Sequence, residues 1–145
     1  LIFLFTFDHA ENAETYLNIV RFNMHFGSAL DILLIPLFNV LRSAHTAPNL
    51  ELTMFDVKYP CPFRDYIKQL PEVVSRHMGT MVGATSSLKV IYGSRVPNYV
   101  MINQWLNEEN FQGYLHKTIE LAKFITQVGT GADKNVIEEA TKKIE

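Results

Sequence analysis

Two histidines stand at matching points of the chain and have the chemistry of a general base. His25 and His77 each follow an apolar helical stripe and precede a glycine by two residues. Histidine changes charge near neutral pH, so either side chain is a candidate for taking a proton from a substrate. The alternative is structural, because a histidine in the last turn of a helix also interacts favourably with the helix C-terminus. Neither belongs to a metal-binding motif, so no metal or other cofactor is predicted.

A second set of candidates lies on one face of a predicted strand at residues 99–106. Tyr99, Met101, Asn103 and Trp105 alternate along it and therefore share a face. Large apolar groups around one amide are typical of a ligand pocket, so Tyr99, Asn103 and Trp105 are predicted to bind substrate. We expect the opposite face of the strand to lie under the helices. The alternative is that Trp105 anchors the core and donates its N–H to a backbone carbonyl.

Three further residues have side chains that could take part in a site. Asp31 is the one charged residue in the apolar stretch 30–41. Burying a lone carboxylate is costly, so Asp31 is expected to line the pocket, to face solvent or to begin a strand. Tyr66 and Tyr114 occupy matching places in apolar helical stripes, and we interpret both as core residues rather than catalytic acids.

The elements that would position these residues repeat at an interval of roughly 50 residues. The matching pairs, in chain order, are Tyr16 and Tyr66, His25 and His77, Pro48 and Pro97, and Phe63 and Phe111. The two copies are about 1–78 and 50–128 and share the helix around Tyr66. Residues 132–145 are interpreted as a short helical tail, so the whole chain, 1–145, is expected to form a single domain.

Apolar periodicity predicts an α+β fold. Helical stripes run over 13–24, 63–78 and 111–125, and strand-like runs lie at 1–7, 30–40, 50–57, 88–92 and 99–106. This order predicts a ferredoxin-like antiparallel sheet with helices on one face, partly duplicated. Gly27 and Gly79 are expected to end the first two helices in the left-handed conformation.

Composition excludes several classes of partner. The chain has 145 residues, a formal net charge of −2 and scattered basic residues, so nucleic-acid binding is not expected. The apolar runs at 1–7 and 30–41 are too short to span a membrane. Cys61 is the only cysteine, which rules out a disulfide within the chain and favours a reducing, cytoplasmic compartment.

Residues 99–115 carry a resemblance to a known superfamily. An apolar strand ends in Trp105, a polar turn follows, and an aromatic residue and the pair Tyr114-Leu115 come next. This pattern resembles the dimeric α+β barrel superfamily, which includes the antibiotic-biosynthesis monooxygenases and related families of unknown function. The likeness covers residues 50–126 and marks a fold more than an activity. It implies a homodimer in which two sheets face each other and enclose a pocket.

The resemblance also implies candidate functions. Its members include cofactor-independent oxygenases of polyphenolic or quinone-like compounds, so this chain is expected to bind an apolar or aromatic small molecule. His77 or His25 would act as the base, while Asn103 and Trp105 orient the substrate. Haem degradation is disfavoured, because His116 comes too early in its helix to match the iron ligand of that branch. The alternatives are a non-catalytic structural or interaction domain with a filled barrel, and a ligand-responsive sensor.

Overall fold

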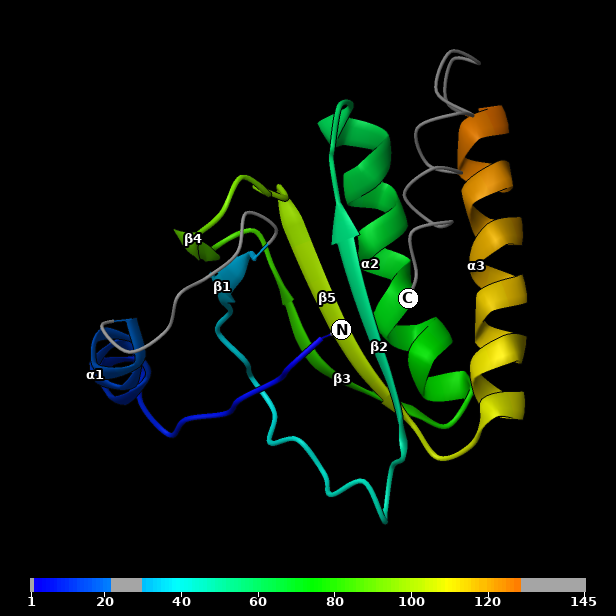
Figure 1. The fold of residues 1–145 in the computed structure, drawn as a ribbon. Coiled ribbons are helices and arrows are strands. Elements are labelled where there is room, and N and C mark those ends of the chain that lie inside the picture. The colour runs from blue at the N-terminus through cyan, green and yellow to red at the C-terminus, as the bar shows by residue number, and fades with distance from the viewer. Residues whose placement is uncertain (1, 22–29, 129–145) are drawn as a thin grey trace.

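The computed structural model describes residues 2–21 and 30–128. It has an α+β architecture in which a three-stranded antiparallel sheet lies against two helices, with a smaller two-stranded sheet and a third helix beside it (Figure 1). The elements are, in order, α1 (Ala10–Arg21), β1 (Ile32–Leu34), β2 (Asn49–Phe55), α2 (Pro60–Arg76), β3 (Gly79–Thr85), β4 (Lys89–Tyr92), β5 (Tyr99–Trp105) and α3 (Glu108–Val128).

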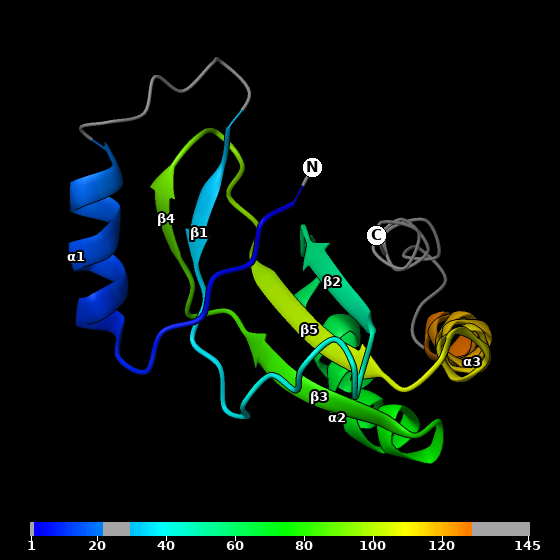
Figure 2. The same ribbon diagram turned by 60° about the horizontal axis from the view of Figure 1, so that its bottom comes forward.

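The larger sheet has the order β2-β5-β3, so its last strand in the sequence is its central one. β5 pairs antiparallel with both neighbours, and α2 carries the chain from β2 to β3 across the helical side of the sheet (Figure 2). The pairing of β2 with β5 is regular from Asn49 opposite Trp105 to Phe55 opposite Tyr99. The two outer strands are therefore parallel to each other and separated by an antiparallel strand, an arrangement called a split β-α-β unit.

The two faces of this sheet have separate apolar cores. The helix-facing side joins Phe55, Met101 and Trp105 to residues of α2 and α3. The other side joins Val82, Val100 and Ile102. The central strand alternates between the two, and all of β5 after Tyr99 is buried. Both cores are possible because successive side chains of a strand point to opposite faces. The helical residues of the helix-facing core are Tyr66, Leu70, Val74, Tyr114, Ala122 and Ile125.

A segment of the chain itself covers the face away from the helices. Ile35, Leu37 and Leu41 pack on that core. The Gln104 side chain holds the end of this segment: its Oε1 accepts a hydrogen bond from the Arg42 backbone N–H at 2.8 Å, and its Nε2 donates to the Arg42 carbonyl at 2.9 Å. We call residues 35–42 the cover segment.

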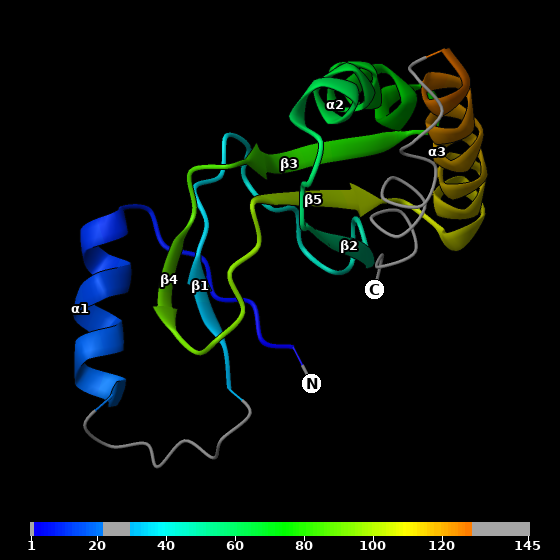
Figure 3. The same ribbon diagram turned by 90° about the horizontal axis from the view of Figure 1, so that it is seen from above.

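The smaller sheet pairs β1 with β4 and lies to one side of the larger sheet, with α1 beyond it (Figure 3). Lys89 Nζ at the start of β4 lies 3.0 Å from Glu14 Oε1 of α1. The Phe7 and Tyr16 rings are in contact, with centroids 5.5 Å apart. The apolar residues of 2–7 remain exposed: the exposed fraction is 70% for Phe3 and 62% for Phe5.

Several expectations about the elements are wrong. Residues 2–7 form no strand, and residues 79–85, for which no strand is predicted, form β3. The β3 pattern is hidden in the sequence because Gly79 and Gly83 dilute it and an irregularity in register between Met81 and Gly83 interrupts its alternation. The left-handed residue after α2 is Met78, with φ 61°, while Gly79 already belongs to the strand.

The orientation of β5 also differs from the expectation. The face of Tyr99, Asn103 and Trp105 does not line a barrel and instead lies under α2 and α3. The opposite face of β5 carries only apolar side chains and Gln104. The cover segment packs on these apolar side chains and hydrogen-bonds the Gln104 amide, so this face is buried without a helix. The proposed internal repeat stays a prediction, because residues 22–29 lie outside the described part of the chain.

Gly79 has no side chain because Trp105 occupies the space that one would fill. A Cβ at Gly79 would overlap the six-membered ring of Trp105, and Gly79 pairs with Trp105 in the sheet. We expect Gly79→Ala to lower the free energy of unfolding by about 2 kcal/mol or more in urea titrations, because the buried ring has no room to move. In the control, Gly83→Ala, the closest atom is the flexible end of Leu37, so the loss should be smaller. Equal losses would contradict this account.

Candidate functional site

A carboxyl group is buried between the sheet and the helices. Glu51 lies on the helix-facing side of β2 with 1% of its surface exposed. Thr53 Oγ1 donates a hydrogen bond to Glu51 Oε1 at 3.0 Å. Asn103 Nδ2 and Trp105 Nε1 both donate to Glu51 Oε2, at 2.9 and 3.3 Å. Alternation within the paired strands β2 and β5 brings these four side chains to one face, and we call them, with Tyr114, the Glu51 cluster.

Two atoms of the Glu51 cluster are buried without a hydrogen-bond partner among the described residues. They are Asn103 Oδ1, an acceptor, and the hydroxyl oxygen of Tyr114, which is near Glu51 and Asn103 but makes no well-formed hydrogen bond to either. Leaving a buried polar group unpaired costs about 1–3 kcal/mol, and each such group in a folded protein calls for an explanation. A carboxylate also has room for about four hydrogen bonds, of which Glu51 uses three. The cluster therefore has unused capacity for a further polar group.

Burial shifts the titration of the whole cluster. Loss of solvent raises the pKa of Glu51 above its usual range, and the hydrogen bonds from Asn103, Thr53 and Trp105 only partly oppose this. No ion pair to Glu51 occurs within residues 2–21 and 30–128. Burial also raises the pKa of the Tyr66 and Tyr114 hydroxyls, and repulsion from the Glu51 carboxylate adds to both shifts. Buried groups with shifted pKa values that gather beside a cavity are typical of functional sites.

An open cleft of about 550 Å³ adjoins the Glu51 cluster. It lies between the start of β2 and the first turns of α3. Trp105 lines it and also donates its indole N–H to Glu51, so this side chain connects the cleft with the cluster. The Trp105 ring is completely buried and contacts the rings of Phe111 and Tyr114. The remaining lining residues are Pro48, Asn49, Leu50, Glu108, Phe111 and Gln112.

The structure brings together two of the predicted site residues, Asn103 and Trp105. Trp105 does anchor the core, but its N–H bonds the Glu51 carboxylate rather than a backbone carbonyl. Tyr99 lies apart from them and packs edge-on against Phe55 and Phe63.

The other predicted residues lie elsewhere. His77 caps α2, with Nδ1 2.8 Å from the Val73 carbonyl oxygen, and is not among the described residues that line the cleft. This position fits the alternative in which His77 interacts with the C-terminus of its helix. His25 lies outside the described residues. Asp31 accepts a hydrogen bond from the Arg95 backbone N–H at 3.0 Å, in the loop beside Gly93, and so has no part in this site.

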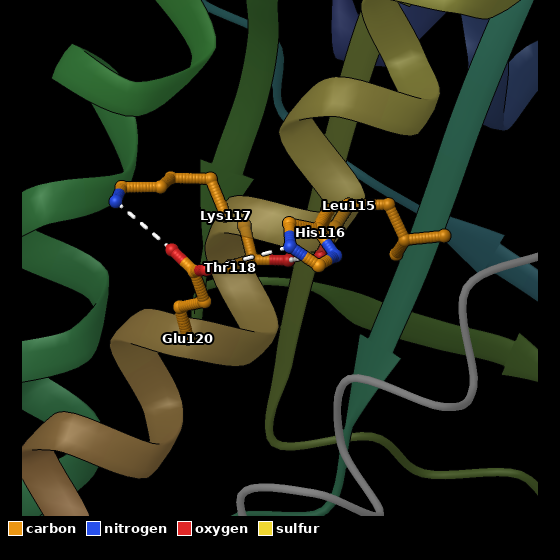
Figure 4. A network of polar contacts seen from close by, with 5 residues as sticks. All are labelled: Leu115, His116, Lys117, Thr118 and Glu120. Atoms are coloured by element: carbon orange, nitrogen blue, oxygen red, sulfur yellow. Dashed lines mark hydrogen bonds and ion pairs between the residues drawn. The ribbon is translucent and has the colours of Figure 1, made fainter.

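The polar contacts on α3 are separate from the cluster. Figure 4 shows Lys117 and His116 reaching Glu120, with Lys117 Nζ 3.0 Å from Glu120 Oε2. These side chains are exposed, and the contact with Lys117 lowers the pKa of Glu120. Thr118 Oγ1 donates to the Leu115 carbonyl at 2.8 Å. His116 therefore belongs to the outer side of the helix.

Sequence reasoning missed Glu51, although a signal was present. In 49–55 the residues Glu51, Thr53 and Phe55 alternate with Leu50, Leu52 and Met54, so a carboxylate had to share a face with an aromatic residue. The interpretation of Tyr114 as a core residue is correct for its burial but overlooks its unpaired hydroxyl.

Comparison with known proteins adds no relative. No family model, curated protein or solved structure matches this chain. Among the residues that the structure describes, no three His, Cys, Asp or Glu side chains gather to hold a metal ion, and no helix is long and apolar enough to cross a membrane.

The raised pKa of Glu51 predicts a pH-dependent stability. A carboxyl that binds its proton more tightly in the folded state stabilises the fold below its unfolded pKa of about 4.3, and this contribution is lost as pH rises through the folded pKa. The difference in unfolding free energy between wild type and Glu51→Gln should therefore fall from pH 4.5 to pH 8. The fall should be about 1.4 kcal/mol for every tenfold difference in proton affinity between the folded and unfolded states. The exposed Glu72→Gln is the control, and a flat difference for Glu51→Gln would refute the account.

The unpaired hydroxyl of Tyr114 predicts an unusual response to its removal. Tyr114→Phe should leave stability unchanged or raise it by about 1 kcal/mol in chemical denaturation, because it removes a buried group that has no partner. The control is Tyr66→Phe, which removes a hydroxyl that lies near Thr118 and is not among the unpartnered buried atoms, so its loss should cost about 1 kcal/mol. If Tyr114→Phe is the more damaging of the two, the hydroxyl has a partner within the protein.

Proposed function

We propose that this protein binds an apolar or aromatic small molecule that carries a hydroxyl group. The molecule occupies the cleft beside Trp105, and its hydroxyl is held by the Glu51 cluster. The observation that carries the proposal is the pair of unpartnered buried atoms, Asn103 Oδ1 and the Tyr114 hydroxyl oxygen, next to a carboxyl with spare hydrogen-bonding capacity. A ligand hydroxyl supplies both a donor and an acceptor to such a group of atoms.

The cleft supports the apolar part of the proposal. Leu50, Phe111 and Pro48 supply apolar surface, and Asn49 and Gln112 supply amides at its rim. Apolar walls with a few placed polar groups are typical of small-molecule sites. Trp105 lines the cleft and donates its indole N–H to Glu51, so a ligand in the cleft lies beside the residue that leads to the cluster.

At the level of fold, we propose that β2, α2, β3, β5 and α3 form a ferredoxin-like unit of the dimeric α+β barrel type. The order β2-β5-β3 and the position of both helices on one face support this assignment. The cover segment adds an element to such a unit, because it occupies part of the face that the resemblance assigns to a partner sheet.

Cofactor-independent oxidation is the reaction that the resemblance implies, and it needs a base at the substrate hydroxyl. Glu51 fits this role better than His77, because Glu51 contacts Trp105 and Asn103 and its raised pKa makes it a stronger base than an exposed carboxylate.

A non-catalytic interaction domain is the second candidate. The observation that favours it is the filled space between sheet and helices, where Met101, Asn103 and Trp105 are 0–1% exposed. The exposed apolar side chains of Ile2, Phe3 and Phe5 would then belong to a contact surface.

Trp105 is the only tryptophan, so its fluorescence tests the first candidate directly. We expect 2-naphthol to change this fluorescence saturably and to bind more tightly than its methyl ether, which has no O–H to donate. Phe111→Ala removes the apolar wall that α3 gives the cleft, and the dissociation constant should rise about tenfold.

The control is Ile119→Ala, on the same helix but outside the cleft, which should change the dissociation constant less than about twofold. Equal effects of the two substitutions, or a fluorescence change that never saturates, would favour the interaction domain.

A further inference from the structure

Within the part of the chain that the structure describes, β2 is an edge strand with few of the features that usually protect one. Within the described residues it pairs only with β5, and its other edge lies at the side of the sheet (Figure 3). It is seven residues long and pairs without a bulge. Natural proteins protect such edges with lysines, prolines, bulges or inward-pointing charges, because unpaired backbone groups attract another strand. The only charge in β2 is Glu51, and the Glu51 cluster already holds its carboxyl.

We propose that β2 pairs antiparallel with β2 of a second copy of this chain, forming one continuous sheet across a two-fold axis. In this register Leu52 lies opposite the partner's Leu52, and Leu50 lies opposite the partner's Met54. The strand is therefore self-complementary on its outer face: apolar residues meet apolar residues, and no like charges oppose each other.

The exposure of β2 supports a second copy as the occupant. Leu50 is 41% exposed, and Leu52 and Met54 are only partly buried against the outer core. Across the axis these side chains would meet the same three residues and extend the core formed by Val82, Val100 and Ile102. Apolar pairs directly opposite each other are the main source of side-chain stabilisation between strands.

The second copy also completes the proposed ligand site, and this part of the inference rests on the proposed function. The cleft begins at Asn49 and Leu50, at the start of the open edge. Pairing around Leu52 brings the partner's Phe55 beside Asn49 and carries the partner's chain past Pro48. The dimer thereby adds a wall to a cleft that the described residues of one chain leave open.

The oligomeric state of the full chain tests the pairing without any ligand. We expect sedimentation velocity to show a dimer. Leu50→Lys places a charge on the open edge and should shift the protein to monomer, with an association constant lower by about tenfold or more. The matched control is Leu106→Lys: Leu106 is 40% exposed, much as Leu50 is, but lies beyond the end of β5. A monomeric wild type, or equal effects of the two lysines, would overturn the proposal.

A cross-link tests the register itself. In a Cys61→Ser background, Leu52→Cys should form a disulfide-linked dimer on mild oxidation, because position 52 meets itself at the axis. Asn49→Cys in the same background faces the partner's Phe55 and should not. A dimer that cross-links equally at both positions, or only at 49, would place the interface elsewhere.

Binding of 2-naphthol by a monomeric wild type would refute the pairing and leave the proposed function standing. A cross-linked dimer that binds no 2-naphthol would support the pairing and refute the proposed function.

Discussion

The structure depends on how it accommodates one buried carboxyl group. Glu51 joins the edge strand β2 to the central strand β5 through Asn103 and Trp105, and its hydrogen bonds hold the largest side chain of the core in place. Truncating any one donor would leave the buried carboxyl group short of a hydrogen-bond partner, which is costly in an apolar layer. The position of Trp105 in turn requires Gly79 on the neighbouring strand, and so the carboxyl determines which residues are tolerated across all three strands.

A sheet with a polar group on one face needs a strong apolar core on the other. The cover segment supplies it by packing Ile35, Leu37 and Leu41 over Val100 and Ile102. Because that face is covered from within the chain, the part of the sheet that residues 2–21 and 30–128 leave open is the edge at β2 rather than the surface. The exposed apolar residues at 2–7 contact α1 and lie outside both cores.

Periodicity predicted the elements whose pattern is strong. The helices at 63–78 and 111–125 and the strands at 50–57 and 99–106 correspond to α2, α3, β2 and β5. The prediction of secondary structure failed where the composition of a segment did not match its structure. Residues 2–7 have the composition of a strand, but a strand needs a neighbour, and the described part of the chain provides none for them. Of the candidate site, Asn103 and Trp105 came from alternation along a single strand. Glu51 could not be joined to them, because the register between β2 and β5 is a long-range property that no local pattern contains.

The contact between Gln104 and Arg42 has an evolutionary consequence. Gln104 uses both ends of its amide on the backbone of residue 42 and none on its side chain. Any amino acid except proline presents the same N–H and carbonyl at position 42, so this position is free to drift while position 104 is not. The outer surface of the molecule at this point can therefore acquire new side chains over time without loosening the attachment beneath it.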